Sequence, residues 1–360
     1  MLARLSAAVV MLAGPPVAAQ QGHVRGAGAE VRHTVLADGV HQFTTLRDSY
    51  VRQLNSVAIV NERDVLVFDT DTRPSTARIV LAEIRKLTDR PVRWVVNSHW
   101  HPDHWSGNEV YADAFPGLEI VSTELTRQFM RNVSSGWPAQ LKEELKGREA
   151  AWAKELESGT RPDGSPLTPQ ARKDDEEDLA DYRSLVDELS KVRRTFPNTT
   201  FGDALTLQGG AREIRLLSVT GDAEGTAVLY LPKEKILLTG DAVSYPIPYV
   251  TPPPTRQAAA LRGLARLDVD LIVPGHGPAF RDRKFLELEA ELLESVSRDV
   301  RAALQSGMRS LPDVQAAVTA EGLRPRFTGG DPELDERYRD RVRALVKLAV
   351  REARDGQDLR

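Results

Sequence analysis

The sequence predicts a mixed α/β fold, and two observations support this expectation. Predicted strands come first along the chain, and a strand–helix–strand unit follows over residues 65–96, which is typical of folds that pack helices against a sheet. Several later strands end in a Gly-Asp or Gly-His pair. Because glycine allows a close approach of the backbone, such strand ends can hold polar side chains in fixed positions.

The first part of the chain contains short strands separated by turns. Residues 61–64, Asn-Glu-Arg-Asp, separate two runs rich in β-branched residues and predict a hairpin. Residues 76–87 place apolar side chains at helical spacing, and a second helix is expected over residues 107–115. The strands predicted in this part are residues 42–46, 56–60, 65–68, 91–96 and 118–121.

A cluster of metal-ligand residues follows the strand over residues 91–96. His99, His101, Asp103 and His104 include three of the seven histidines of the chain, and imidazole and carboxylate groups suit zinc and similar divalent ions. In an extended backbone His99 and His101 point to the same side, because side chains alternate. Pro102 then breaks the strand. One loop can therefore supply two adjacent metals, whereas the alternative is a histidine-rich surface loop.

Residues 122–197 differ from their surroundings because they are highly charged and have helical patterns. Thr168-Pro169 is a good helix start, with a capping oxygen followed by proline at the first helical position. This helix is expected to reach about Arg193. We interpret the acidic run over residues 174–178 as a solvated face. The whole segment is predicted to be an inserted helical hairpin beside the site, where it would form one wall of a substrate cleft.

Sheet patterns return after this segment, and three of the strands lead into candidate ligands. The pairs at their ends are Gly221-Asp222, Gly240-Asp241 and Gly275-His276. A helix is expected over residues 255–267, and residues 283–360 read as a helical extension that packs on the core or on a partner subunit. The strands predicted here are residues 204–208, 213–219, 227–231, 235–238 and 270–273.

The N-terminus and the composition predict an exported protein. Arg4 precedes an apolar run over residues 5–13, and small residues end at Ala19, where a signal peptidase would cut. The run is shorter than the ~20 residues that span a bilayer; an irregular apolar terminus or an uncleaved anchor is the alternative. We expect a periplasmic or secreted protein with a signal peptide over residues 1–19. The chain has no cysteine, so its stability must come from a core.

The net charge of −4 argues against a sequence-independent nucleic-acid binder, which would need a basic face. After the signal segment, no stretch resembles a membrane span. The partner that the family resemblance given below implies is a small-molecule substrate.

Together these residues resemble the metallo-β-lactamase fold superfamily, because the His-x-His-x-Asp-His motif and the later strand ends follow its order. The resemblance implies a four-layer αββα sandwich over residues 35–282. It implies that His99 and His101 bind a first metal, that Asp103, His104 and His276 bind a second, and that Asp241 bridges the two. It also implies that Asp69 orients a ligand or a loop by hydrogen bonds.

One position departs from the family pattern. The family usually has a Gly-His-Thr-x-Gly segment, and Asp222 stands where its histidine belongs, with Glu224 as the next candidate. The alkylsulfatase branch of the superfamily has an acidic ligand in its first metal site. A third carboxylate would leave the site less positive and would favour Mn²⁺ or Fe²⁺ relative to the usual pattern. The lack of cysteine excludes the β-lactamases that use cysteine in place of Asp241, and an aspartate there resembles glyoxalase II and lactonases.

The resemblance implies a hydrolase that uses one or two zinc ions and attacks an ester, lactone or amide carbonyl with a metal-bound hydroxide, and the predicted signal peptide adds that it is exported. Asp103 would orient the hydroxide or carry a proton. Tyr245 and Tyr249 would donate to the oxyanion or line the pocket, unless they pack in a Pro-rich loop. Trp100 and Trp105 would shape and desolvate the site. The alternatives are a catalytically weak or inactive member that binds a metal or ligand, and an alkylsulfatase-like hydrolase.

Overall fold

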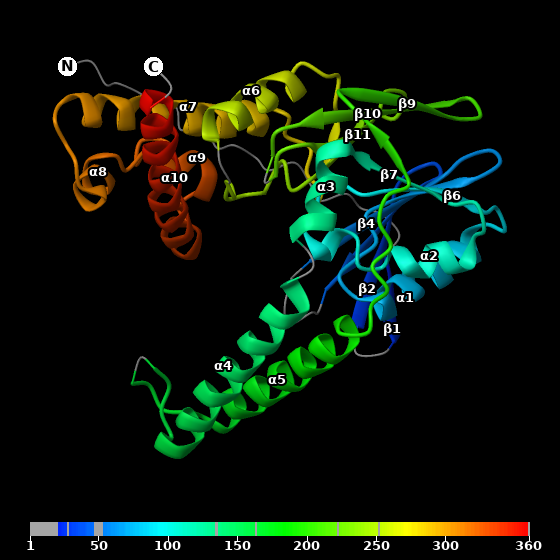
Figure 1. Ribbon diagram of the computed structural model, residues 1–360, viewed down its shortest axis with the longest axis horizontal. Helices are drawn as coiled ribbons and strands as arrows, with labels where there is room; N and C mark the ends of the chain where they lie inside the picture. Colours follow the sequence, from blue (N-terminus) through cyan, green and yellow to red (C-terminus); the bar gives the residue numbers. More distant parts are fainter. Residues whose placement is uncertain are drawn as a thin grey trace, which may run out of the picture.

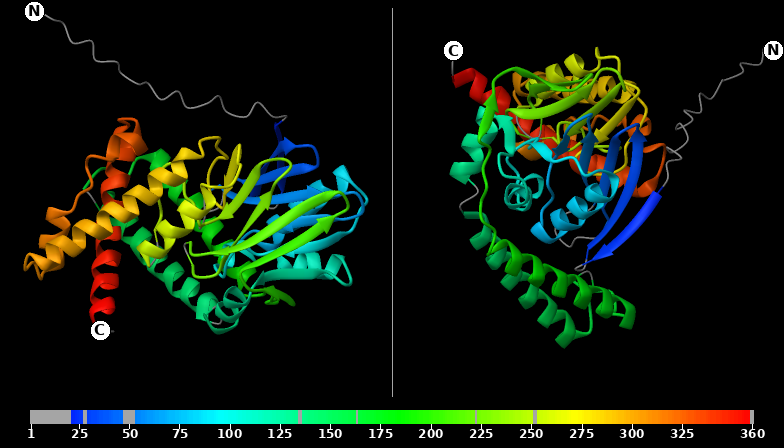
Figure 2. Two further views of the ribbon diagram at one scale, coloured as in Figure 1. Left: turned by 90° about the horizontal axis from the view of Figure 1, so that it is seen from above. Right: turned by 90° about the vertical axis from the view of Figure 1, so that its right-hand side faces the viewer.

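Two β-sheets face each other, and helices cover both outer faces (Figures 1 and 2). The structure is a computed structural model. It describes residues 21–26, 29–46, 53–133, 136–162, 164–221, 223–250 and 253–358. The predicted α/β class and four-layer αββα sandwich are confirmed. The predicted signal peptide and the position of Asp222 lie outside the described residues.

The larger sheet has eight strands, which lie side by side in chain order. The strands from β1 to β5 pair antiparallel, and those from β5 to β8 pair parallel. The antiparallel pairing of β4 with β5 confirms the predicted hairpin. The strands are β1 (Gln21–Gly26), β2 (Ala29–Ala37), β3 (Val40–Thr45), β4 (Leu54–Val60), β5 (Val65–Phe68), β6 (Val92–Val96), β7 (Glu119–Thr123) and β8 (Thr199–Phe201).

The smaller sheet has five strands in the order β13-β12-β11-β10-β9, and only the β12–β13 pair within it is parallel. The apolar residues between the sheets form one core, to which Trp94 of the larger sheet and Leu238 of the smaller sheet both belong. This core holds the two sheets face to face. The strands are β9 (Ala204–Gly209), β10 (Arg212–Val219), β11 (Thr226–Leu231), β12 (Ile236–Gly240) and β13 (Leu271–Pro274).

The outer face of the larger sheet packs against α1 (Pro74–Leu87) and α2 (Asn108–Ala114). Val80 and Ile84 of α1 are buried there beside Val67 of β5, as the helical spacing of the apolar residues predicts. The loop between β6 and α2 contains a single 3₁₀ turn, η1 (Pro102–His104). Proline at the first position of this turn ends the strand and redirects the ligand motif.

The outer face of the smaller sheet packs against the C-terminal helices in one continuous core. These are α6 (Pro254–Leu264), α7 (Lys284–Gln305), α8 (Leu311–Ala317), α9 (Arg324–Thr328) and α10 (Pro332–Asp358). The carboxylate of Asp331 accepts hydrogen bonds from the backbone of Glu333 and Leu334 and so caps the start of α10.

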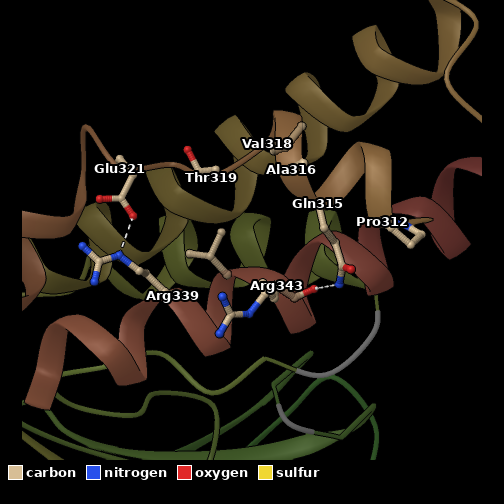
Figure 3. A pocket seen from close by; sticks show the side chains of 9 residues that line it. Pro312, Gln315, Ala316, Val318, Thr319, Glu321, Arg339 and Arg343 are labelled. Atoms are coloured by element: carbon tan, nitrogen blue, oxygen red, sulfur yellow. Dashed lines mark hydrogen bonds and ion pairs between the residues drawn. The ribbon is translucent and has the colours of Figure 1, made fainter. Parts of the chain in front are cut away.

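A groove of about 410 Å³ lies between α8 and α10 in this extension (Figure 3). Arg339 donates to Glu321 at 3.1 Å, and the side-chain amide of Gln315 donates to the carbonyl of Arg343 at 2.9 Å. The groove shares no residue with the candidate metal centre described below.

The charged segment between β7 and β8 forms three helices. These are α3 (Glu124–Val133), α4 (Trp137–Ser158) and α5 (Pro169–Leu189). Helices α4 and α5 form a hairpin that extends away from the sheets (Figure 1), with its own small core around Tyr182 and Leu185. The hydroxyl of Thr168 caps α5, as predicted. The hairpin is tied to the start of α1 because Arg73 pairs with Asp181 at 2.9 Å and Ser75 bonds to Glu188.

Several boundaries differ from the sequence predictions. Strands β1, β2 and β8 were not predicted from the sequence. Strand β8 is three residues long, too short to give a pattern. Helix α5 ends at Leu189 and not at Arg193. Among the described residues, no helix combines the length and the apolar character needed to cross a membrane.

Candidate metal centre

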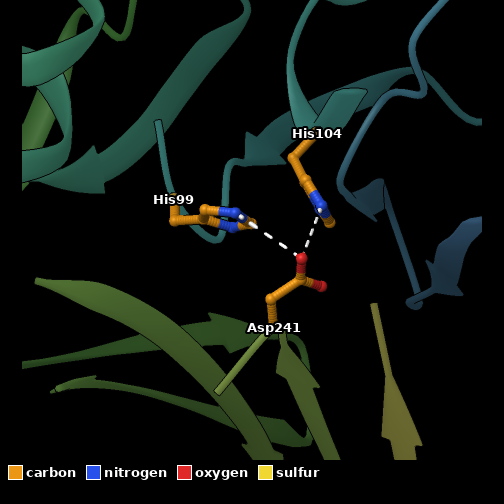
Figure 4. A group of neighbouring side chains, drawn as sticks. All are labelled: His99, His104 and Asp241. Carbon is orange, nitrogen blue, oxygen red and sulfur yellow. Dashed lines mark ion pairs between the residues drawn. The ribbon is translucent and has the colours of Figure 1, made fainter. Parts of the chain in front are cut away.

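The candidate ligands meet where strands of both sheets end. In the larger sheet, Asp69 follows β5 and His99 comes shortly after β6, and these two strands are parallel. In the smaller sheet, Asp241 follows β12 and His276 comes shortly after β13, and these strands are also parallel. Figure 4 shows His99 and His104 on one side, with Asp241 reaching them from the strands opposite. Each parallel pair therefore ends at the same edge of the sandwich, and this edge brings together side chains that are far apart in the sequence.

Asp103, His104 and His276 form a compact group. Each offers one ligand atom, and these atoms all lie within 4.8 Å of one another. Oδ2 of Asp103 lies 3.3 Å from Nε2 of His104 and 3.2 Å from Nε2 of His276. These are the three residues that the family resemblance assigns to the second metal.

Asp241 lies between this group and His99. Its Oδ2 atom is 3.8 Å from Nε2 of His99, 3.5 Å from Nε2 of His104 and 3.4 Å from Nε2 of His276. With His99 and His104 it forms a second group of ligand atoms within 4.8 Å. This central placement is the one expected of a bridging carboxylate.

The remaining predicted ligands, His101, Asp222 and Glu224, do not belong to either compact group of ligand atoms among the described residues. The ring of His101 lies 4.5 Å from the ring of His99, centroid to centroid, but His101 is in neither compact group. Asp222 lies outside the described residues. Its neighbour Gly221 is closely packed, because a Cβ there would lie 2.6 Å from the Cα of Ala242, directly after Asp241. Glu224 forms an exposed ion pair with Arg256 at 2.8 Å.

The ionisation state of each central side chain depends on the charges of its neighbours. Burial would raise the pKa of Asp103 and Asp241, but His104 and His276 outweigh it and hold both values well below the usual range. Burial would lower the pKa of His276, but Asp241 and Asp103 raise it to about 10. The same balance raises the pKa of His104 well above its usual value. The carboxylates are therefore ionised and the two histidines carry protons that a metal would displace.

His99 behaves differently from these histidines. Burial and the neighbouring His104 hold its pKa well below the usual value, so its imidazole is neutral at pH 7. A neutral imidazole has a free lone pair for a metal.

Asp69 lies beneath the ligands and organises them. Its Oδ2 atom accepts a hydrogen bond from Nδ1 of His104 at 2.7 Å. Its two oxygens also accept from the backbone and the hydroxyl of Ser98, at 2.7 and 2.8 Å. The hydroxyl of Ser98 in turn lies 2.9 Å from Nδ1 of His99. These contacts leave Nε2 of each histidine on the metal-facing side.

Two glycines allow the strand ends to approach each other. A Cβ at Gly275 would lie 2.1 Å from Oδ1 of Asp241 and 2.9 Å from Cε1 of His104. Gly240 has a φ of +50°, and a Cβ there would lie 2.5 Å from the Cβ of Ser98. A larger residue would displace Asp241 or His104 at position 275, and Ser98 at position 240.

The donor set fits a divalent transition metal. It consists of imidazole nitrogens and carboxylate oxygens, which zinc prefers. Nε2 of His104 is buried and lies 3.3 Å from Asp103 and 3.5 Å from Asp241, but neither contact has the geometry of a hydrogen bond. A buried nitrogen in this position is costly unless a ligand satisfies it. The site therefore has the composition and the unsatisfied nitrogen expected of a metal centre.

A family model described as the metallo-beta-lactamase superfamily matches residues 49–276. The chain belongs to this superfamily. The match contains all the candidate ligands, from His99 to His276.

Known members of the superfamily are distantly similar. The chain is 25% identical over 303 residues to a linear primary-alkylsulfatase from Pseudomonas sp. (strain ATCC 19151), covering 81% of this chain and 53% of that protein. The chain thus spans about half the length of this relative.

Two solved structures share the fold. A stereoselective inverting sec-alkylsulfatase from Pseudomonas sp. has a TM-score of 0.59 at 16% identity, covering 88% of this chain and 49% of the other. A metallo-beta-lactamase family protein from Thermus thermophilus has a TM-score of 0.56 at 18% identity, covering 90% and 95%.

Aromatic side chains surround the metal edge of this metallo-β-lactamase fold. The ring of Trp100 lies against His101, with centroids 4.4 Å apart, and 5.9 Å from the ring of Phe129 in α3. Trp105 is buried and donates to the carbonyl of Trp100 at 2.9 Å. Leu125, one turn before Phe129 on α3, is 44% exposed. An apolar row therefore leads from solvent to the first predicted metal position.

The two tyrosines of the Pro-rich loop have packing contacts. The ring of Tyr245 stacks on Phe280, with centroids 4.4 Å apart, and meets Phe285 edge to face. The ring of Tyr249 is 42% exposed and lies beneath the guanidinium of Arg341. These contacts favour the packing interpretation, and a catalytic role for Tyr245 stays a prediction.

Sequence reasoning did not single out two residues that shape the site, Ser98 and Asn55. Ser98 directly precedes the motif, so its position was a usable signal. Asn55 contacts residues 219 positions away in the chain, and no local pattern marks it.

Proposed function

We propose that the protein is a metal-dependent hydrolase that acts on a small molecule, with one or two zinc ions held by His99, His101, Asp103, His104, Asp241 and His276. One observation carries the proposal. Two groups of buried or partly buried imidazole and carboxylate donors share His104 and lie around the central carboxylate of Asp241. Asp222 is proposed to complete the first metal position, where Mn²⁺ or Fe²⁺ would also suit the added carboxylate.

A sulfate ester of an alkyl alcohol is the substrate class that we favour. The similarity to an alkylsulfatase over 81% of the chain supports it. The apolar row formed by Leu125, Phe129 and Trp100 also supports it, because these side chains could cover an alkyl chain next to His101. An acidic residue at position 222 fits the same branch of the family.

The side chains of the site have separable roles in this proposal. Bound metal ions would supply Lewis acidity and would make water more acidic. Asp103 is held ionised by its histidine neighbours, so it can orient water or accept a proton from it. Asp69 holds His104 in one orientation through its 2.7 Å hydrogen bond. Trp100 and the buried Trp105 would exclude bulk water from the edge of the site.

The first experiment measures metal content and sulfate release together. Protein purified without added zinc is analysed for metals and then incubated with decyl sulfate. We expect at least about one equivalent of a transition metal and released sulfate, whereas fewer than about 0.5 equivalents would overturn the metal assignment. Asp241→Asn should lose both properties. Asp268→Asn is the matched control, because Asp268 is an exposed aspartate that pairs with Lys235.

The same preparation tests the other substrate class. An ester, lactone or amide carbonyl is the alternative, and a lactone panel with nitrocefin detects it. Hydrolysis of these compounds without sulfate release would replace the sulfate ester in our proposal. If no compound is hydrolysed although metal is bound, the protein is a metal-binding or ligand-binding member of the family. Activity that appears only in Asp222→His would support that interpretation.

We also propose that the protein is exported to the periplasm or secreted. Residues 1–19 support this proposal, because Arg4 precedes an apolar run and small residues end at Ala19, before the predicted cut. N-terminal sequencing of the protein from a cell fractionation tests the proposal. We expect Gln20 as the first residue, and an intact Met1 or Leu2 would contradict cleavage.

A further inference from the structure

The start of β4 pairs with the opposite sheet at the metal edge. Strand β5 pairs with β4 only over Val57–Val60, so one edge of β4 is uncovered before that point. The loop that carries His276 pairs with this uncovered edge through backbone hydrogen bonds. The backbone N–H of Asn55 donates to the carbonyl of Gly275 at 2.8 Å, and that of Gly277 donates to Gln53 at 2.9 Å. Leu54 and His276 form the antiparallel bridge between these two bonds.

The side chain of Asn55 adds two hydrogen bonds to the same loop. Its amide nitrogen donates to the carbonyl of Pro274 at 2.9 Å and to the carbonyl of Gly277 at 2.8 Å. These carbonyls flank His276 on both sides. Asn55 is 2% exposed, so water does not compete strongly for these bonds.

The orientation of this amide is fixed by two further donors. Oδ1 of Asn55 accepts from Nε2 of Gln42 at 2.7 Å and from Oγ1 of Thr44 at 2.8 Å. Nε2 of Gln42 also donates to Oγ1 of Thr44 at 3.1 Å. Both donors and the acceptor of the Asn55 side chain are thus used. The larger sheet therefore holds the loop of the smaller sheet through a fully satisfied, buried network.

We propose that Asn55 is a positioning residue for His276 and thereby sets the affinity of the metal bound by Asp103, His104 and His276. His276 is 29% exposed and is the least enclosed of these three side chains, so its loop needs external support. The inference rests on the proposed metal site and is independent of the substrate. It distinguishes the two metal positions, because the amide nitrogen of Asn55 donates both of its hydrogen bonds to the loop that carries His276.

The test compares two buried asparagines at opposite ends of β4, Asn55 within its first residues and Asn61 directly after its last. Asn55→Ala removes the support of the loop. Asn61→Ala removes an amide that is 3% exposed and lies just after the other end of β4, where it donates to Asp64. Competition with a chelator measures the two metal affinities of each variant, and the spectrum of bound Co²⁺ reports ligand geometry. We expect Asn55→Ala to weaken one of the two affinities by about tenfold or more and to change the Co²⁺ spectrum. Asn61→Ala should change neither.

Assignment of the weakened position uses His276→Ala as a reference. The position lost in His276→Ala must be the one weakened in Asn55→Ala. Equal weakening of both positions, or affinities matching those of Asn61→Ala, would overturn the inference while leaving the proposed hydrolase in place. Wild-type protein that binds no metal would overturn both. If Asn55→Ala does not fold, Thr44→Val decides by the same criteria, because it removes one donor that orients the amide.

Discussion

The carboxylate of Asp69 accepts a hydrogen bond from Nδ1 of His104 at 2.7 Å, and both side chains are completely buried. The Nδ1 proton is thereby directed toward Asp69, and Nε2 faces Asp103 and Asp241. Asp69 has a φ of +58°, a left-handed conformation that is uncommon outside glycine. Its position directly after β5 thus places a buried carboxylate under the ligand motif of the neighbouring strand.

Asp69→Asn should weaken metal binding about 10- to 100-fold, because the amide cannot accept all the hydrogen bonds of the carboxylate. Chelator competition measures the affinity. Asp71→Asn is a close control, because Asp71 is also buried, also has a positive φ, of +75°, and belongs to the same loop. Its carboxylate accepts hydrogen bonds from the hydroxyl of Thr45 and from the backbone of Thr72. Equal losses in the two variants would show that the effect of Asp69 is general destabilisation.

Gly275→Ala should abolish metal binding at the position where Asp241 and His104 are both proposed ligands. The new methyl group would lie 2.1 Å from Oδ1 of Asp241, so either the carboxylate or the loop must move. Metal stoichiometry and a thermal unfolding curve measure the effect. Gly263→Ala is the control, since the nearest atom to a Cβ there is 3.8 Å away and its helical position favours alanine. Full metal content in Gly275→Ala would contradict this steric argument.

Metal binding should release protons and strengthen as the pH rises. In the metal-free site Asp241 and Asp103 raise the pKa of His276 to about 10, so this histidine is protonated at pH 7 and must lose its proton to bind a metal. Calorimetry in buffers of different ionisation enthalpy should detect on the order of one to two protons released per protein. His276→Ala should release about one fewer. A binding enthalpy that does not depend on the buffer would contradict the prediction.

Glu289 should destabilise the fold as the pH rises. Both of its carboxyl oxygens are buried without a hydrogen-bond partner among the described residues, and burial raises its pKa well above the usual value. The folded protein therefore keeps a proton that the unfolded chain releases above about pH 4.5. Its contribution is complete below that pH and is lost as the pH rises toward the folded pKa.

Urea unfolding of wild type and Glu289→Gln at several pH values measures this effect. Relative to Glu289→Gln, the wild type should lose up to about 1.4 kcal/mol of unfolding free energy for each pH unit above about pH 4.5, until the raised pKa of the folded state is reached. Glu291→Gln serves as the control. Glu291 lies on the same helix as Glu289, α7, but it is exposed and pairs with Arg326 of α9. Parallel pH profiles for the wild type and Glu289→Gln would show that Glu289 is not protonated in the folded protein.

Much of the fold was predictable because its patterns are local. The starts of α5 and α10 follow from Thr168-Pro169 and Asp331-Pro332, where the capping residue and proline act within one turn. Strand β8 and the two N-terminal strands were missed. Strand β8 has three residues and depends on pairing with β7 for its existence, so its own sequence carries little signal.

The sequence by itself determined which side chains are available as ligands and that each follows a strand. The motif from His99 to His104 and the glycines before Asp241 and His276 are local features, and local backbone rules describe them. Only the tertiary structure decided how those strand ends meet. The Asp69–His104 and Asn55–Pro274 bonds join residues 35 and 219 positions apart. Such contacts depend on the packing of two sheets around their shared core, which no periodicity within a single segment contains.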